Sequence, residues 1–202
     1  MKKNLLLFII SCFSISSFSQ IYKDEIIEYQ NNMNLEFSDS SKSPLSTDDR
    51  LKFKKLDFFE IDSSYRIKAE FKRTAYEIPF AMKTTTSRMP MYVKYGEITF
   101  ELHGEKHSLN IYQNIDLVKK EAYADYLFLP FTDLSNGNES YGGGRYIDLK
   151  IPQGNYIIID FNKAYNPYCA YNAFDYNCPI VPVENKLPVE IRAGVKYDDI
   201  YH

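Results

Sequence analysis

The chain has 202 residues, 16% aromatic and 25% charged, with 18 tyrosines, 14 phenylalanines and no tryptophan. This composition excludes a disordered chain, collagen, a coiled coil and a multi-span membrane protein. The formal net charge of -3 disfavours a nucleic-acid binder, and three histidines and three cysteines leave little material for a transition-metal site.

The first nineteen residues are predicted to be a secretory signal peptide. Lys2 and Lys3 form a charged start, residues 5–15 are mostly apolar, and small residues precede a cleavage site before Gln20. The alternative is a lipoprotein, cleaved before Cys12 and anchored by a lipid on its sulfur. Both readings predict an exported protein, periplasmic or secreted, with no transmembrane segment in the mature chain. Removing two of the 24 basic residues leaves 22 against 27 acidic, a net charge of -5.

After cleavage before Gln20 the cysteines that remain are Cys169 and Cys178, which would close a ten-residue loop. An even pair in an oxidising compartment predicts a disulfide bond. A redox or nucleophilic thiol is the alternative, although no histidine lies near either cysteine in the sequence.

A single domain is expected for this length, preceded by a helix and connector over residues 20–55. Ile26, Ile27, Met33 and Phe37 recur near helical spacing and predict an amphipathic helix over residues 21–37. Residues 46–49 resemble a capping signal for one further helical turn.

From residue 56 to the end the pattern predicts a β-rich domain. Apolar and charged residues alternate over residues 65–72, as in a strand with one buried face. The fold class is therefore mainly β, a single-domain antiparallel sandwich or partly closed barrel of about nine to ten strands after one N-terminal helix. Further strands are predicted at Leu56–Ile61, Tyr76–Met82, Met91–Tyr95, Tyr126–Pro130, Tyr146–Ile151, Asn155–Asp160 and Val189–Ala193.

The clearest hairpin is predicted over residues 98–113. Matching the inward apolar residues of its two strands pairs Phe100 with Leu109 and Ile98 with Ile111, around a four-residue loop at residues 103–106.

No metal ion or other cofactor is predicted. The spacing of His103 and His107 would suit a metal on a helix, but the hairpin puts one in a solvated turn and the other at a strand start. Asp160, Asn162 and Asn166 resemble calcium-ligand spacing but lack the glycine and the closing glutamate of the calcium loop.

Arg145 is a candidate anchor for an anion or carboxylate. Alternation with Ile147, Leu149 and Ile151 places it on the inward face of a strand. An inward guanidinium needs a partner, and Asp133 or Asp160 could supply it. A structural ion pair in the interior is the alternative to an anchor at the mouth of a pocket.

Loops of the C-terminal half are the expected place for a site, because they contain most of the glycines and many of the prolines. Asp160 and Asn162 project together from one strand face, and seven tyrosines between residues 141 and 176 could stack on a ligand or fill the core. No serine, histidine and aspartate suggest a triad, so acid and base would come from carboxylates. The candidate catalytic residues are Asp133, Asp160 and Glu184.

Three sequence blocks carry a family resemblance. They are residues 79–88, residues 129–133 continuing to 143–146, and residues 160–167 followed by Cys169 and Cys178. From Ser43 to Lys196 the chain resembles domain-of-unknown-function family 1684, which brings no established activity, substrate or cofactor. The family pattern Ala-Gly-Glu-Lys reads here as residues 193–196, with valine in place of glutamate. The resemblance draws attention to Arg88, Asp133, Arg145, Asp160, Asn162, Asn166, Glu184 and Asn185.

Three functions remain open from the sequence. The first is binding of a small molecule or glycan in a polar, tyrosine-lined pocket near the C-terminal loops. The second is a hydrolase with paired carboxylates, and the third is a structural envelope protein without catalysis. The predicted ligand-binding residues are Arg88, Arg145, Tyr146, Asp160, Asn162 and Asn166.

Overall fold

The computed structural model describes the backbone of residues 2–197 and the side chains from Gln20 onward. Two α-helices open the chain, α1 at Lys2–Ser38 and α2 at Thr47–Lys52. The strands that follow are β1 Arg66–Arg73, β2 Phe80–Ala81, β3 Met91–Leu102, β4 Glu105–Asn114, β5 Tyr126–Phe131, β6 Arg145–Lys150 and β7 Tyr156–Asp160. Short 3-10 turns connect several of them.

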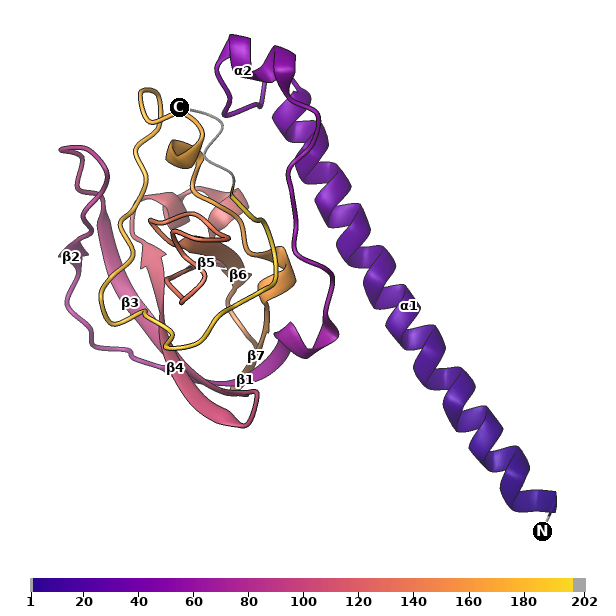
Figure 1. Cartoon of the computed structure of the whole chain (residues 1–202). Helices are drawn as coiled ribbons and strands as arrows, with labels where there is room; N and C mark the ends of the chain where they lie inside the picture. Colours follow the sequence, from indigo (N-terminus) through magenta and orange to yellow (C-terminus); the bar gives the residue numbers. More distant parts are fainter. Residues whose placement is uncertain (1, 198–202) are drawn as a thin grey trace.

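The strands form one antiparallel sheet of seven, in the order β6-β5-β4-β3-β1-β7, with β2 paired to β3. The sheet curls so that its edge strands β6 and β7 approach each other, as a half-barrel (Figure 1). The prediction of a mainly β, antiparallel fold is confirmed. A single curled sheet corresponds to the partly closed barrel and not to the sandwich.

The predicted count of nine to ten strands is too high for the described residues. Residues 91–95 and 98–102 belong to one long strand, β3, with an irregularity between Lys94 and Gly96. The segment 56–61 makes one isolated bridge, between Phe58 and Val195. Residues 189–193 alternate in burial like a strand, but the carbonyls of Ile191 and Ala193 accept hydrogen bonds from a guanidinium instead of a neighbouring strand.

The hairpin between β3 and β4 exists, but its predicted register is wrong by two residues. Ile98 pairs with Leu109 and Phe100 with His107, around a two-residue turn at His103 and Gly104. Both turn residues have positive φ, 52° and 84°, as in the type I′ turn that matches the twist of paired strands. The shift keeps the predicted apolar residues inward, and His107, predicted at a strand start, is buried opposite Phe100.

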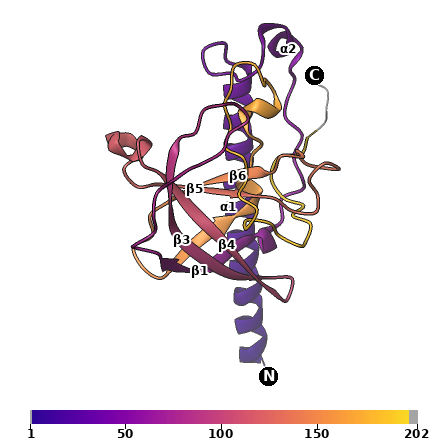
Figure 2. The same cartoon turned by 90° about the vertical axis from the view of Figure 1, so that its left-hand side faces the viewer.

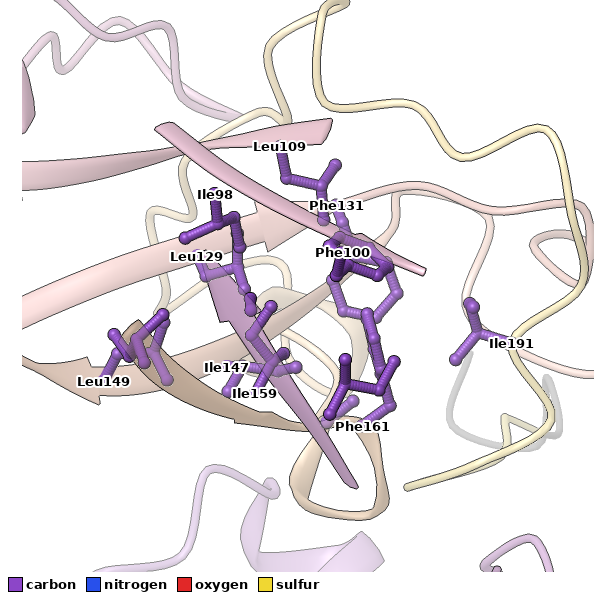
Figure 3. Packing of buried hydrophobic residues seen from close by; sticks show 14 of the residues in the cluster. Ile98, Phe100, Leu109, Leu129, Phe131, Ile147, Leu149, Ile159, Phe161 and Ile191 are labelled. Carbon is purple, nitrogen blue, oxygen red and sulfur yellow. The ribbon is translucent and has the colours of Figure 1, made fainter. Parts of the chain in front are cut away.

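The core lies inside the curled sheet. Side chains from every strand except the short β2 meet there with residues of the C-terminal segment, of which Ile191 is visible beside Phe161 (Figure 3). Because alternate residues of each strand point inward, the outer face of β5 and β6 is left to a second, tyrosine-rich cluster.

Helix α1 runs along one side of the sheet, and its N-terminal part extends beyond the strands (Figures 1 and 2). The helix predicted over residues 21–37 is part of α1, and Ile26 and Phe37 are buried against the domain, but Ile27, grouped with them in the prediction, is 39% exposed. Glu25 forms ion pairs with Lys163 at 2.7 Å and Arg66 at 3.3 Å. The second helical turn is also confirmed, with Ser46 as the N-cap of α2.

Among the residues that the structure describes, no helix combines the length and the apolar character that a membrane crossing needs.

Gly194 offers a test of how tightly the C-terminal segment packs. Its φ is +81°, and an added Cβ would lie 2.5 Å from the carbonyl oxygen of Ala164. We expect Gly194→Ala to lower the free energy of unfolding by roughly 2–4 kcal/mol, because the strain of a positive φ in alanine adds to the overlap of its Cβ with that oxygen. Urea unfolding measures this. Gly154→Ala is the control, since its Cβ would meet nothing within 4 Å; equal stability of the two variants would contradict the packing described.

Candidate functional site

Arg145 and Asp133 form an ion pair in the interior. Nη2 of Arg145 lies 2.9 Å from Oδ2 of Asp133, and both side chains are 0% exposed. The guanidinium also donates to the carbonyl oxygens of Ala193 and Ile191, and the other carboxylate oxygen accepts from the backbone N–H of Ser135 and Ile191. Burial lowers the pKa of Arg145, and the charge of Asp133 opposes this effect. The pair therefore faces no pocket and holds the fold together.

Asp160 and Asn162 lie together, as alternation predicts, but α1 covers them. The Tyr22 hydroxyl donates to both carboxylate oxygens of Asp160, at 3.0 and 3.1 Å. Nδ2 of Asn162 donates to the Asp62 carbonyl at 2.8 Å and to the Tyr22 hydroxyl at 2.9 Å. Their contacts therefore join α1 and the segment before β1 to the end of β7.

The three candidate catalytic carboxylates have separate contacts. Asp133 binds Arg145 and Asp160 binds Tyr22, whereas Glu184 is exposed and accepts from the Tyr112 hydroxyl at 3.0 Å. No hydrogen bond in the described part of the chain links one of these carboxylates to another. The geometry thus supplies no acid and base pair among them.

The remaining polar residues of the family resemblance also lie apart. Arg88 is exposed in the loop between β2 and β3. Asn185 is fully buried, and its amide joins Asn110 of β4 to Pro130 of β5 through hydrogen bonds of 2.7 to 2.9 Å. Asn185 therefore has a structural role.

A pocket of about 580 Å³ lies between the C-terminal half of α1, the outer face of β5 and β6, and the loop 165–179. Of the predicted binding residues, Tyr146 and Asn166 line it, and Arg88, Arg145, Asp160 and Asn162 do not. Eight tyrosines line it among the described residues: Tyr29, Tyr92, Tyr126, Tyr146, Tyr165, Tyr168, Tyr171 and Tyr176.

Asp148 is the polar centre of this wall. The hydroxyls of Tyr126 and Tyr165 both donate to its Oδ1, at 2.8 and 2.6 Å. Burial is the first cause that raises the pKa of both tyrosines, and the charge of Asp148 raises it further. Both hydroxyls therefore stay protonated and keep donating to the carboxylate at neutral pH.

The lining residues include two carboxylates, those of Glu36 and Asp148, and no lysine, arginine or histidine. Asn166 adds a further acceptor. Its Nδ2 donates to the Tyr171 hydroxyl and the Lys196 carbonyl, while its buried Oδ1 has no hydrogen-bond partner in the described part of the chain. Buried acceptors of this kind call for an explanation, and an absent ligand or water is one.

Cys169 and Cys178 are placed as a disulfide pair, with Cα atoms 6.0 Å apart, as the sequence predicts. Cys178 lines the pocket, and the loop that the pair closes contains Tyr171 and Tyr176. The disulfide thus constrains one wall of the pocket.

A second hollow, of about 550 Å³, shares the lining residues Tyr126 and Asp148 with this pocket. It is lined by charges of both signs, among them Arg66, Lys150, Asp160 and Lys163. In the described residues no group of three or more histidine, cysteine, aspartate or glutamate side chains is placed to hold a metal ion.

Sequence reasoning missed Asp148, Glu36 and Tyr29. The alternation that turns Arg145 inward on β6 also turns Asp148 outward, and this signal was available. The contribution of α1 was not, because no local pattern shows which strand a helix will cover.

The fold and the pocket define a mainly β protein whose curled sheet bears a helix-covered aromatic pocket on its outer face. The chain belongs to the family described as protein of unknown function (DUF1684), whose profile matches residues 51–196. It is similar to an uncharacterized protein of Haloarcula marismortui solved by NMR, with 28% identity and a TM-score of 0.69 over 92% of this chain and 99% of that one. A comparison with curated proteins found no match.

The ion pair predicts a stability effect without a binding effect. Arg145→Met leaves Asp133 buried without its partner, so we expect the free energy of unfolding to fall by about 3–5 kcal/mol. Thermal or urea unfolding measures this. The control is Arg192→Met. Because Arg192 is 56% exposed in its ion pairs, this variant should lose less than about 1 kcal/mol of the free energy of unfolding. An Arg145 variant of unchanged stability would contradict a structural role.

The pocket tyrosines predict a loss of stability in alkali. Burial raises the pKa of Tyr126 and Tyr165 above the ordinary 10.0, so the folded protein favours their neutral form. Their contribution is therefore complete below pH 10 and decreases as the pH rises above it. Unfolding measured across this range should depend less on pH in Tyr165→Phe. Tyr76→Phe, at a 99% exposed side chain, should behave as the wild type; identical pH slopes in all three would contradict the prediction.

Proposed function

We propose that this chain is an exported binding protein whose tyrosine-lined pocket, between α1 and the outer face of β5 and β6, takes a small organic ligand. The observation that carries the proposal is the pocket itself, about 580 Å³ in volume. Small-molecule sites usually measure roughly 300–1,000 Å³ and combine aromatic walls with a few fixed polar groups. Export rests on the signal pattern before Gln20.

The polar groups of the pocket are held in place before any ligand arrives. Tyr126 and Tyr165 fix the carboxylate of Asp148, and Tyr146 donates its hydroxyl proton to the Pro179 carbonyl. Fixed polar groups lower the cost of ordering on binding. This arrangement supports a binding role better than a purely structural one, because a core that only needs to pack has little use for an open cavity of this size.

A hydrolase with paired carboxylates has less support. Its candidates Asp133, Asp160 and Glu184 bind three different partners, and two of them are buried. A general acid must come within hydrogen-bond reach of its substrate. The carboxylate of Asp133 is buried against Arg145, so no substrate can reach it.

Binding is tested by a melting-shift screen of the full mature chain with sugars, carboxylic acids and amines. A ligand at about 100 times its Kd should add about 2.7 kcal/mol of stability. The shift should be lost in the double variant Tyr168→Ala/Tyr176→Ala, which removes two pocket rings whose centroids lie 5.2 Å apart.

The matched control for this screen is Tyr156→Ala, a half-exposed tyrosine on β7 outside the pocket, which should keep the shift. The proposal fails if no compound stabilises the protein. It also fails if the double variant and the control respond alike.

A further inference from the structure

Four hydrogen-bond donors of the pocket are already in use. The hydroxyls of Tyr126 and Tyr165 donate to Asp148, that of Tyr146 donates to the Pro179 carbonyl, and that of Tyr29 donates to the Lys163 carbonyl at 3.0 Å. Four tyrosines that could have bound an anion are therefore committed to protein acceptors. What they leave free are oxygen lone pairs and ring faces.

The charge of the pocket has one sign. Glu36 and Asp148 are exposed carboxylates among the lining residues, and no cationic side chain lines the pocket with them. Glu36 has no hydrogen bond or ion pair within the described part of the chain. Lys163 lies 5.8 Å from the ring centre of Tyr29, but its ammonium is paired with Glu25 at 2.7 Å. An anionic ligand would meet repulsion from both carboxylates, and no cationic side chain of the lining would offset it.

Neighbouring aromatic rings of the pocket lie nearly perpendicular to one another. Tyr146 and Tyr165 stand perpendicular, with planes at 90° and centroids 5.9 Å apart. Tyr168 and Tyr176 meet at 78°, and Phe37 meets Tyr171 at 84°. Neighbouring rings at right angles present faces in different directions, and the negative face of an aromatic ring attracts a cation.

We propose that the ligand of this pocket is an organic ammonium cation, held against the tyrosine faces and the carboxylates of Glu36 and Asp148. The inference rests on the proposed binding function and names the class of ligand. A ligand with an N–H group could in addition donate to the free Oδ1 of Asn166. A neutral glycan could stack on the same rings and donate its hydroxyls to the carboxylates, but it would gain no charge attraction from them.

The experiment compares choline with 3,3-dimethyl-1-butanol, its neutral isostere in which carbon replaces nitrogen, by calorimetric titration of the full mature chain. Shape and apolar area are matched, so the difference reports the charge. We expect choline to bind at least about tenfold more tightly than the alcohol. Sodium chloride at the same ionic strength controls for screening.

Glu36→Gln should weaken choline binding several-fold and leave binding of the alcohol unchanged. The side chain is exposed, so the variant should fold as the wild type does. Glu28→Gln is the matched control, because it makes the same charge change on the exposed face of α1 outside the pocket. Its affinity for choline should equal that of the wild type.

Equal or weaker binding of choline relative to the alcohol overturns the cation assignment, and so does an equal loss in the Glu36 and Glu28 variants. If a sugar or a carboxylic acid stabilises the wild type but not Tyr168→Ala/Tyr176→Ala, and choline does not bind, the binding function stands and the ligand class is wrong. If no compound of any class binds, both are wrong.

Discussion

The buried ion pair of Arg145 and Asp133 is the constraint on which the rest of the domain depends. A charge in the interior is costly unless its partners are complete. Arg145 is paired with Asp133 and donates to the carbonyls of Ile191 and Ala193, while its Nε has no partner in the described part of the chain. These contacts tie the start of β6 to the loop after β5 and to the C-terminal segment. That segment buries Ile191 in the core and contains no strand, because its carbonyls serve the guanidinium.

The same pair positions the pocket from the opposite side of the sheet. Once Arg145 points into the core, pleating turns Tyr146 and Asp148 outward on β6. Those two residues, with Tyr126 of the neighbouring strand β5, form the sheet wall of the pocket. A slip of one residue in β6 would both expose the guanidinium and remove the carboxylate from the wall. The register of β6 therefore fixes both the core and the candidate site, which lie on opposite faces of this strand.

Local sequence patterns were sufficient to predict part of the fold and of the candidate site. Period-two alternation found β1, β6 and β7 and the inward direction of Arg145. It could not choose Asp133 over Asp160, because that choice depends on loops that meet only in the folded chain. The hairpin register failed because a shift by two residues keeps the same face inward, so alternation alone could not decide between a four-residue and a two-residue turn. The wall supplied by α1 could not be found at all, since helical periodicity shows which face is buried and not what buries it.

The way α1 docks bears on the predicted export signal. Among the side chains that the structure describes, Tyr22 and Glu25 hold the helix to the domain, and Tyr29 and Glu36 line the pocket. All of them follow the predicted cleavage site before Gln20, and the alternative site before Cys12 would keep them as well. Processing at either position would thus leave the pocket its full helical wall. Cleavage inside the docked segment would instead remove the contact of Tyr22 with Asp160.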